Sequence, residues 1–172
     1  MKTVPVRTFY LQLPDGPARE LRPPREGIEV VRAEQPSVES YRAWYDAVGS
    51  DWNWVDRKLM SDGELGRIIH DELVEIYLLR VEAALAGFAE LDRRTEGQIE
   101  LAYFGLLPGF IGMGLGKYFL NRMVRKARTY RPRRVWLHTC ELDHEAALPM
   151  YLGAGFELYD EKLIDQVIPP PG

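Results

Sequence analysis

The stretch GFIGMGLGK, residues 109–117, decides how this chain is organised. It follows an apolar run typical of a strand and precedes apolar residues at helical spacing from Phe119 to Ala127. Glycines allow a sharp turn and the close approach of a ligand. The first N–H groups of a helix are unpaired and partly positive, which favours a phosphate or pyrophosphate. The alternative interpretation is a glycine-rich turn that binds nothing.

Two common phosphate-binding patterns do not fit this loop. The P-loop pattern needs Ser or Thr after its Gly-Lys pair, and here Tyr118 follows. The dinucleotide pattern GxGxxG lacks its third glycine whether it is begun at Gly112 or at Gly114. The stretch from Lys117 to Arg134 holds eight Lys or Arg and no acid. This charge fits a ligand with several phosphates, and it fits a solvated helix face equally well.

The composition is that of an ordinary folded protein. The chain has 172 residues, 46% of them hydrophobic and 28% charged, with a formal net charge of −4. This length predicts a single domain over residues 1–172, with a strand-and-turn extension over 1–26 and a core over 27–160. Mild acidity argues against a nucleic-acid binder, and no apolar run is long enough to span a bilayer. We therefore expect neither nucleic acid nor a membrane as a partner.

Cysteine usage and the first residues indicate the compartment. Cys140 is the one cysteine, which excludes an internal disulfide framework and a zinc site built from several cysteines, and we expect no metal. The N-terminal MKTVPVRTFYLQLPDGP mixes charges and prolines and lacks the apolar core of a secretory signal. A free thiol without an export signal predicts a cytoplasmic protein. The sequence does not decide the oligomeric state, and a homodimer is one alternative.

Hydrophobic periodicity predicts a mixed α+β fold with one sheet and helices on its faces. Two strands separated by a helical segment, between Gln98 and Cys140, should run parallel. Ser61 and Glu64 have the spacing of a capping box. The expected strands are Val6–Leu13, Gly27–Ala33, Val74–Val81, Leu85–Leu91, Gln98–Leu107, Val135–Cys140 and one from Phe156 on; the expected helices are Val38–Val48, one from Ser61 to about His70, one after the glycine loop and Glu145–Leu152.

At this point the chain resembles the GNAT superfamily of acyl-CoA-dependent N-acyltransferases. The family motif Gln/Arg-x-x-Gly-x-Gly/Ala matches residues 111–116, except that Ile111 replaces the polar first residue. A second family pattern, A-L-x-x-Y-x-x-x-G-F, matches residues 147–156. The order of elements agrees from Gly27 to about Asp160, whereas the strand at Val6–Leu13 lies outside the core pattern.

The resemblance implies a GNAT-like fold. That fold is one mostly antiparallel mixed sheet whose central parallel strands splay apart, with helices on both faces. The C-terminus looks too short for the family's usual final strand pair, so this sheet edge should be completed differently. The stretches 49–57, 104–108 and 138–144 are similar to a subgroup of bacterial GNAT proteins for which no acceptor is known to us.

The resemblance also implies an activity and a donor site. The expected reaction is acetyl-CoA-dependent transfer of an acetyl group directly from the thioester to a primary amine of a small molecule. Alternatives are a protein or peptide N-acetyltransferase, and a CoA-binding module that has lost catalysis. The implied acetyl-CoA contacts are the backbone of Leu106 and Leu107 for the pantetheine arm, the loop residues Ile111, Gly112, Met113, Gly114, Leu115, Gly116 and Lys117 for the pyrophosphate, and His144 near the pantetheine.

Acyl transfer to an amine needs a base for the amine and an acid for the leaving thiolate. Tyr151 matches the family tyrosine that protonates the sulfur, and a half-buried aromatic residue is the alternative interpretation. Glu100 matches the glutamate of the histone-acetylating branch, His138 is a rival base, and Glu90 is a third. Cys140 is interpreted as a small buried hydrophobe.

The acceptor is expected near the segment that follows the first helix. Trp52 and Trp54 would form an aromatic wall for an apolar or aromatic amine, or stack on a cation. The alternative is that these tryptophans only pack the segment onto the core. Arg57 would bind a substrate carboxylate, or pair with an acid of the protein.

Overall fold

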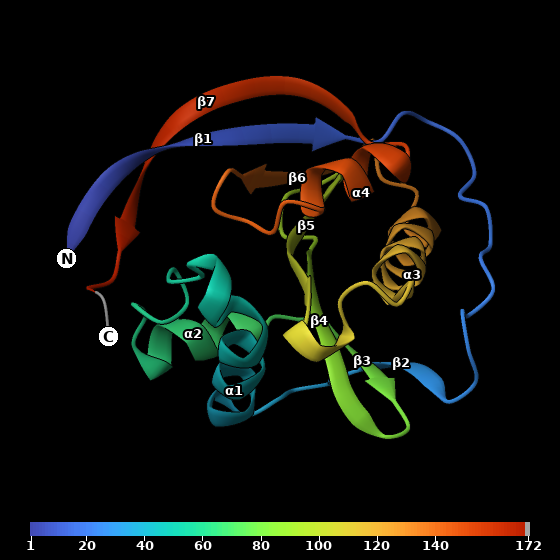
Figure 1. Cartoon of the computed structure of the whole chain (residues 1–172), viewed down its shortest axis with the longest axis horizontal. Helices are drawn as coiled ribbons and strands as arrows, with labels where there is room; N and C mark the ends of the chain where they lie inside the picture. Colours follow the sequence, from blue (N-terminus) through green and yellow to red (C-terminus); the bar gives the residue numbers. More distant parts are fainter. Residues whose placement is uncertain (171–172) are drawn as a thin grey trace.

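The computed structural model describes residues 1–170 as one seven-stranded sheet with helices on both faces (Figure 1). The strands follow the order β2-β3-β4-β5-β6-β1-β7, and each predicted strand and helix is present. The strands are β1 (Lys2–Gln12), β2 (Ile28–Arg32), β3 (Val74–Val81), β4 (Ala84–Asp92), β5 (Gln98–Leu106), β6 (Arg134–Cys140) and β7 (Glu157–Ile168), and the helices are α1 (Val38–Gly49), α2 (Asp62–Ile69), α3 (Leu115–Thr129) and α4 (Ala147–Gly153).

Strands β2 to β5 form an antiparallel meander, as the short turns between them require. The chain then crosses through α3 to β6, which pairs parallel with β5. The capping box predicted at the start of α2 is present, with the Ser61 hydroxyl accepting from the Glu64 N–H and Glu64 accepting from the Ser61 N–H. No helix in residues 1–170 is long and apolar enough to cross a membrane.

Strand β1 inserts between β6 and β7, so this side of the sheet is completed differently from the family's usual final strand pair, as predicted. It pairs antiparallel with β6, where Tyr10 lies opposite His138, and antiparallel with β7, where Tyr10 lies opposite Asp160. Figure 1 shows β1 and β7 as two long strands that run side by side. The N-terminal strand, which lies outside the family's core pattern, is therefore an interior strand of the sheet.

The connector between β1 and β2 crosses α3 rather than turning back as a hairpin. Its Leu21 N–H donates to Asn121 Oδ1 at 3.2 Å, and Asn121 Nδ2 donates to the Arg19 carbonyl at 2.5 Å. Pro24 lies 3.6 Å from the position of a Cβ at Gly114, at the start of α3. The connector thus carries the chain from one side of the sheet to the opposite edge strand.

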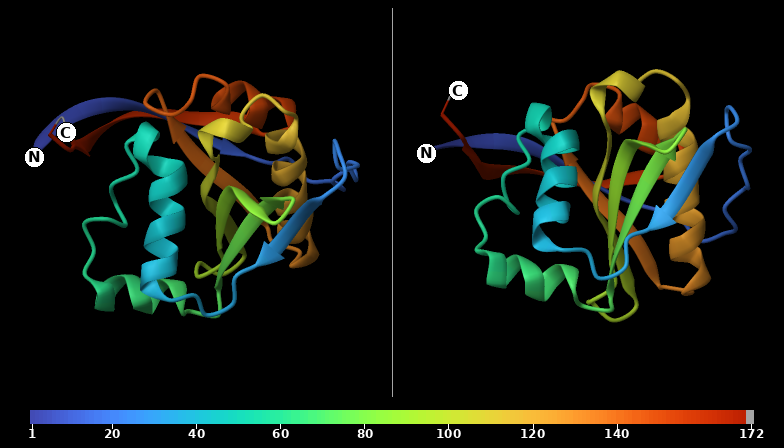
Figure 2. Two further views of the ribbon diagram at one scale, coloured as in Figure 1. Left: turned by 60° about the horizontal axis from the view of Figure 1, so that its bottom comes forward. Right: turned by 90° about the horizontal axis from the view of Figure 1, so that it is seen from below.

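Two apolar layers hold the helices against the sheet. The larger one buries Leu11, Phe119 and Leu120 between the sheet and the α3–α4 side. The smaller one packs Tyr41 and Phe88 beneath α1 and α2. Figure 2 shows α1 and α3 on opposite sides of the strands. Helices α1 and α2 pack mainly on β3, β4 and β5 on that face.

We predict that β1 is as important for stability as any interior strand. Leu11 is fully buried, so Leu11→Ala should lower the free energy of unfolding by about 2–5 kcal/mol. Leu163 on the neighbouring β7 is 70% exposed, so Leu163→Ala is the matched control and should change it by less than about 0.5 kcal/mol. Urea denaturation measures both. Equal small effects would mean that β1 contributes little to the fold.

Candidate active site

The parallel strands β5 and β6 pair only at one end. Their register covers three residue pairs and stops at Glu100 opposite Trp136. Beyond that point β5 stays paired with β4 as far as Leu106, and β6 stays paired with β1 as far as Cys140. The predicted splay of the central strands is confirmed. The inner edge of β5 beyond Glu100 therefore presents backbone groups to a gap in the sheet.

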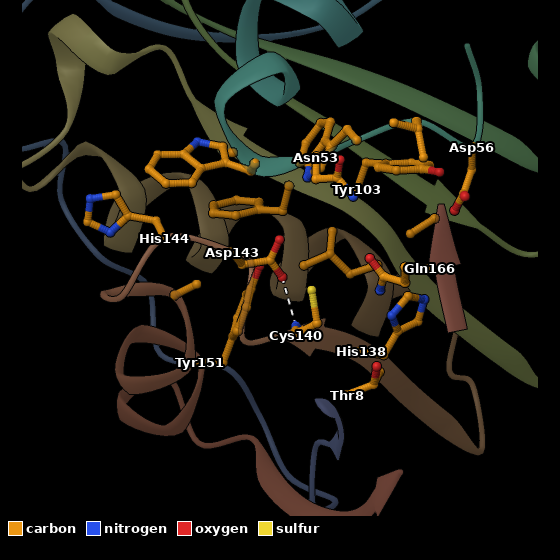
Figure 3. A pocket seen from close by; sticks show the side chains of 18 of the residues that line it. Thr8, Asn53, Asp56, Tyr103, His138, Cys140, Asp143, His144, Tyr151 and Gln166 are labelled. Carbon is orange, nitrogen blue, oxygen red and sulfur yellow. Dashed lines mark hydrogen bonds between the residues drawn. The ribbon is translucent and has the colours of Figure 1, made fainter. Parts of the chain in front are cut away.

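A cavity of about 450 Å³ occupies this gap (Figure 3). Residues from α3, α4 and the end of β5 line one part of it, among them Leu106, Gly116 and Met150. Tyr45 and Trp54, from the α1 side of the sheet, line another part. Since the lining comes from both faces of the sheet, two molecules bound on opposite faces would meet in the gap.

The glycine loop ends where α3 begins. Gly112 and Gly114 have φ angles of 86° and 77°, a region that favours glycine. Gly114 is the N-cap residue, and no side chain caps the helix. The first N–H groups of α3 are thus left without an intrahelical partner. Gly116 lines the cavity. A Cβ at this position would lie only 3.1 Å from Met150 Sδ, so the start of α3 packs closely against α4 here.

The other predicted donor residues differ in what they can offer. Ile111 lines the cavity, whereas the Leu115 side chain is fully buried, so only its backbone is available. Met113 is 44% exposed and Lys117 is also exposed at this end of α3. Leu106 lines the cavity. Leu107 does not line it, and its backbone is already paired: its N–H donates to the Ala86 carbonyl and its own carbonyl accepts from the Phe110 N–H.

Tyr151 presents its hydroxyl to the cavity. The residue is 7% exposed, and its ring packs edge-on against Phe104 and Phe156. No hydrogen bond joins its hydroxyl to the other cavity residues drawn in Figure 3, and the residue lines the cavity. Burial, with a contribution from Asp143, raises the pKa of Tyr151, so the hydroxyl keeps its proton at neutral pH. It can donate that proton to a bound group.

The two rival bases of the sequence lie next to each other. Glu100 Oε1 is 3.7 Å from His138 Nε2, but only His138 lines the cavity. Burial lowers the pKa of His138, an effect that Asp143 and Asp56 oppose. The ring is therefore mostly neutral at pH 7. Figure 3 shows it at the end of the cavity near Gln166.

Glu100 lies behind His138 in an acidic environment. Its side chain is 23% exposed. Its pKa is raised to about 7, because the side chain is buried and faces the carboxylates of Asp92 and Glu90. Glu100 is thus a group that gains or loses a proton near neutral pH beside a histidine that can exchange one.

Arg57 and Glu90 form a buried ion pair. Arg57 Nη2 lies 2.7 Å from Glu90 Oε2, and the Tyr41 hydroxyl donates to Glu90 Oε1 at 2.6 Å. The Glu90 side chain is fully buried, and neither partner lines the cavity. The guanidinium is therefore committed to an acid of the protein, the alternative that the sequence had left open, and neither residue enters our proposal as a substrate or catalytic group.

Aromatic side chains form the wall above the gap. Trp54 packs on Tyr45 and Tyr103, with ring centroids 5.3 and 5.0 Å apart, so it both belongs to the core and lines the cavity. Trp52 lies edge-on to His144 at 5.0 Å. His144 Nδ1 accepts from the Ala146 N–H at 2.9 Å and lines the cavity, which leaves Nε2 available.

Sequence reasoning did not single out several residues of the cavity. Asp143 Oδ2 accepts from the Thr139 hydroxyl and the Cys140 N–H, and so holds the end of β6 in place. Asn53 Nδ2 donates to the Val167 carbonyl at 3.1 Å, which joins two walls of the cavity. Asp143 lies within a quoted motif and was accessible to sequence reasoning, whereas the Asn53 contact depends on a strand 114 residues away.

Comparison with known proteins agrees with this geometry. The family model described as acetyltransferase (GNAT) family matches residues 36–156. An uncharacterized N-acetyltransferase of Mycobacterium bovis is 26% identical over 106 residues, which are 62% of this chain and 67% of the relative.

Solved structures share the fold. A GCN5-related N-acetyltransferase from Sphaerobacter thermophilus superposes with a TM-score of 0.69 at 20% identity, over 95% of this chain and 52% of that one. A functionally unknown conserved protein from Staphylococcus epidermidis gives a TM-score of 0.68 at 18% identity, over 94% of this chain and 61% of that one. This chain thus spans about half and three fifths of these two. With the family match covering most of its length, the chain belongs to the acetyltransferase (GNAT) family.

Proposed function

We propose that this protein is an acetyl-CoA-dependent N-acetyltransferase that acetylates a primary amine of a small molecule. The observation that carries the proposal is the cavity in the gap between β5 and β6, with the uncapped start of α3 beside it. The gap offers an unpaired strand edge for an amide-bearing arm, and the helix start offers N–H groups for a pyrophosphate.

The chain's own groups fit this donor. The free edge of β5 up to Leu106 would pair with the pantetheine arm, and the backbone from Gly112 to Lys117 would hold the pyrophosphate. His144 Nε2 would donate to or accept from the arm. Ile111 supplies no polar contact, so we assign the pyrophosphate to backbone groups.

His138 is the base in this proposal, with Glu100 as its partner. The neutral ring lines the cavity, where it would accept a proton from the amine. The Glu100 carboxylate, 3.7 Å away, would stabilise the imidazolium that forms. Glu100 acts through His138 and is a positioning residue.

Tyr151 is the acid. As the amine nitrogen forms its bond to the acetyl carbon, the carbon–sulfur bond breaks and the thiolate takes a proton from the Tyr151 hydroxyl. The raised pKa of Tyr151 keeps the hydroxyl protonated until that point. No group of the protein needs to carry the acetyl group, and burial raises the pKa of Cys140, so its thiol stays a weak nucleophile.

A bounded acceptor site favours a small molecule over a peptide. The Asn53–Val167 hydrogen bond joins the segment after α1 to β7, both of which line the cavity. An extended peptide would need an open groove in which to lie. The same bond encloses a free amine of limited size.

We expect acetyl-CoA to raise the midpoint of thermal unfolding by roughly 5–10 °C at a concentration about 100-fold above Kd. NADH and ATP should not reproduce this shift. Gly112→Ala should reduce it, because a side chain at a φ of 86° strains the loop that presents its N–H groups. Gly16→Ala is the matched control, since Gly16 also has a positive φ and open space around it. No shift for the parent protein would contradict acetyl-CoA binding.

Tyr151→Phe should lower kcat by about 100-fold or more, because the thiolate then leaves without a proton donor. KM for acetyl-CoA should change little, since the phenyl ring still packs against Phe104 and Phe156. Release of free thiol in the presence of an amine panel measures both. Tyr77→Phe, an equally buried tyrosine that bonds to Glu75, controls for loss of a hydroxyl elsewhere. An unchanged kcat would remove Tyr151 from the mechanism.

Glu100→Gln should change how stability depends on pH. The folded-state pKa of Glu100, about 7, lies above its ordinary 4.5, so its contribution is fully present below pH 4.5 and is lost as pH rises through 7. The variant should therefore gain about 2–3 kcal/mol relative to the parent between pH 5 and pH 8. Urea denaturation at both pH values measures this. Glu145→Gln, at an exposed acid, is the matched control. Parallel pH curves for Glu100→Gln would show that Glu100 ionises normally.

A further inference from the structure

The cavity is negatively charged. The residues that line it include three carboxylates, Asp56, Asp143 and Asp165, and no Lys or Arg among residues 1–170. They come from three different elements: the segment after α1, the turn after β6, and β7. Figure 3 shows Asp143 beside Tyr151 and Cys140, and Asp56 at the end of the cavity that holds Tyr103 and His138.

These carboxylates lack cationic partners in the described part of the chain. Asp56 and Asp165, both exposed to solvent, form no ion pair, and Asp143 bonds through Oδ2 only to neutral groups. The basic residues that follow Asp56 are committed elsewhere, because Arg57 pairs with Glu90 at 2.7 Å and Lys58 pairs with Asp46 at 3.0 Å. The charge of the cavity is therefore not neutralised by the protein.

Two further observations indicate a ligand in this space. Tyr151 is more than nine-tenths buried, yet its hydroxyl points into the cavity without a hydrogen bond to the other cavity residues drawn in Figure 3. The rings of Tyr45, Trp54 and Tyr103 contact one another and border the acidic end. The faces of aromatic rings attract organic cations.

From this geometry we infer that the acceptor is a small organic dication that carries no carboxylate. One amine would lie at His138 and react, while a second cationic group lies near Asp56 and Asp165 against the aromatic wall. A substrate carboxylate would meet like charges with no Arg or Lys to accept it, which disfavours amino acids. This inference rests on the proposed function and narrows its substrate class.

The test compares matched amines that differ by one carboxylate. Cadaverine is compared with lysine, and agmatine with arginine, by release of free thiol from acetyl-CoA. We expect kcat/KM to be at least about 10-fold higher for the amine without the carboxylate. The carboxylate of the matched amino acid is repelled by the acids of the cavity, and the amine lacks this group. The preference should weaken as salt is added. Equal values, or a preference for the amino acids, would overturn the inference.

Variants link the preference to the carboxylates. Asp56→Asn combined with Asp165→Asn should raise KM for cadaverine about 10-fold and reduce its kcat/KM advantage over lysine. Asp51→Asn is the matched control, because Asp51 is an exposed acid in the same segment that does not line the cavity. An unchanged ratio in the double variant would remove these acids from acceptor binding.

Binding separates this inference from the proposed function. If acetyl-CoA does not stabilise the protein and no amine causes release of free thiol, the proposed function itself is contradicted. If the protein binds CoA, thermal unfolding of the CoA-loaded protein with cadaverine or lysine reports acceptor binding without turnover. Stabilisation by cadaverine and not by lysine supports the dication. The reverse result, or no stabilisation by cadaverine at tens of millimolar, rejects it while CoA binding stands.

Discussion

The site depends on a pair of parallel strands that are kept apart because each has another partner. Beyond Glu100 and Trp136, β5 continues its ladder with β4 while β6 continues with β1. Each strand therefore leaves only its inner edge without hydrogen bonds, which a bound chain can satisfy. Without β1, strand β6 would be an edge strand, and beyond Trp136 it would have no hydrogen-bonded neighbour to fix its position. The N-terminal strand is thus part of what keeps the gap open.

Two glutamates on the same face of the sheet show how environment decides a role. Glu90 is fully buried, but an arginine and a tyrosine hydroxyl satisfy its oxygens, so its charge is matched within the protein. Glu100, one strand further, is buried near Asp92 and Glu90, and the opposing influence of Arg57 and Arg94 on its pKa is smaller. Its pKa therefore rises to about 7. The difference follows from position in the sheet, because both are the same residue type.

Local patterns were sufficient to predict much of the fold. The glycine loop, the capping box at Ser61 and the residues around Tyr151 lie within short stretches whose spacing carries the information. The parallel crossover from Gln98 to Cys140 follows from the order of its elements. The dual interpretation of Arg57 was not resolvable from the sequence, since Glu90 lies 33 residues away and only the sheet brings them together.

Contacts across long sequence separations were not predictable in the same way. No local signal distinguishes a strand that stays outside the core from one that inserts between β6 and β7, because the partners of β1 lie near the opposite end of the chain. The same insertion places β7, and with it Asp165, against the cavity that Asp56 lines from the α1 side. Sheet order therefore brings Asp165 to the cavity, whereas Asp56 and Asp143 reach it from the segments after α1 and β6. A chain that completed this edge with other strands would place different charges beside the same gap.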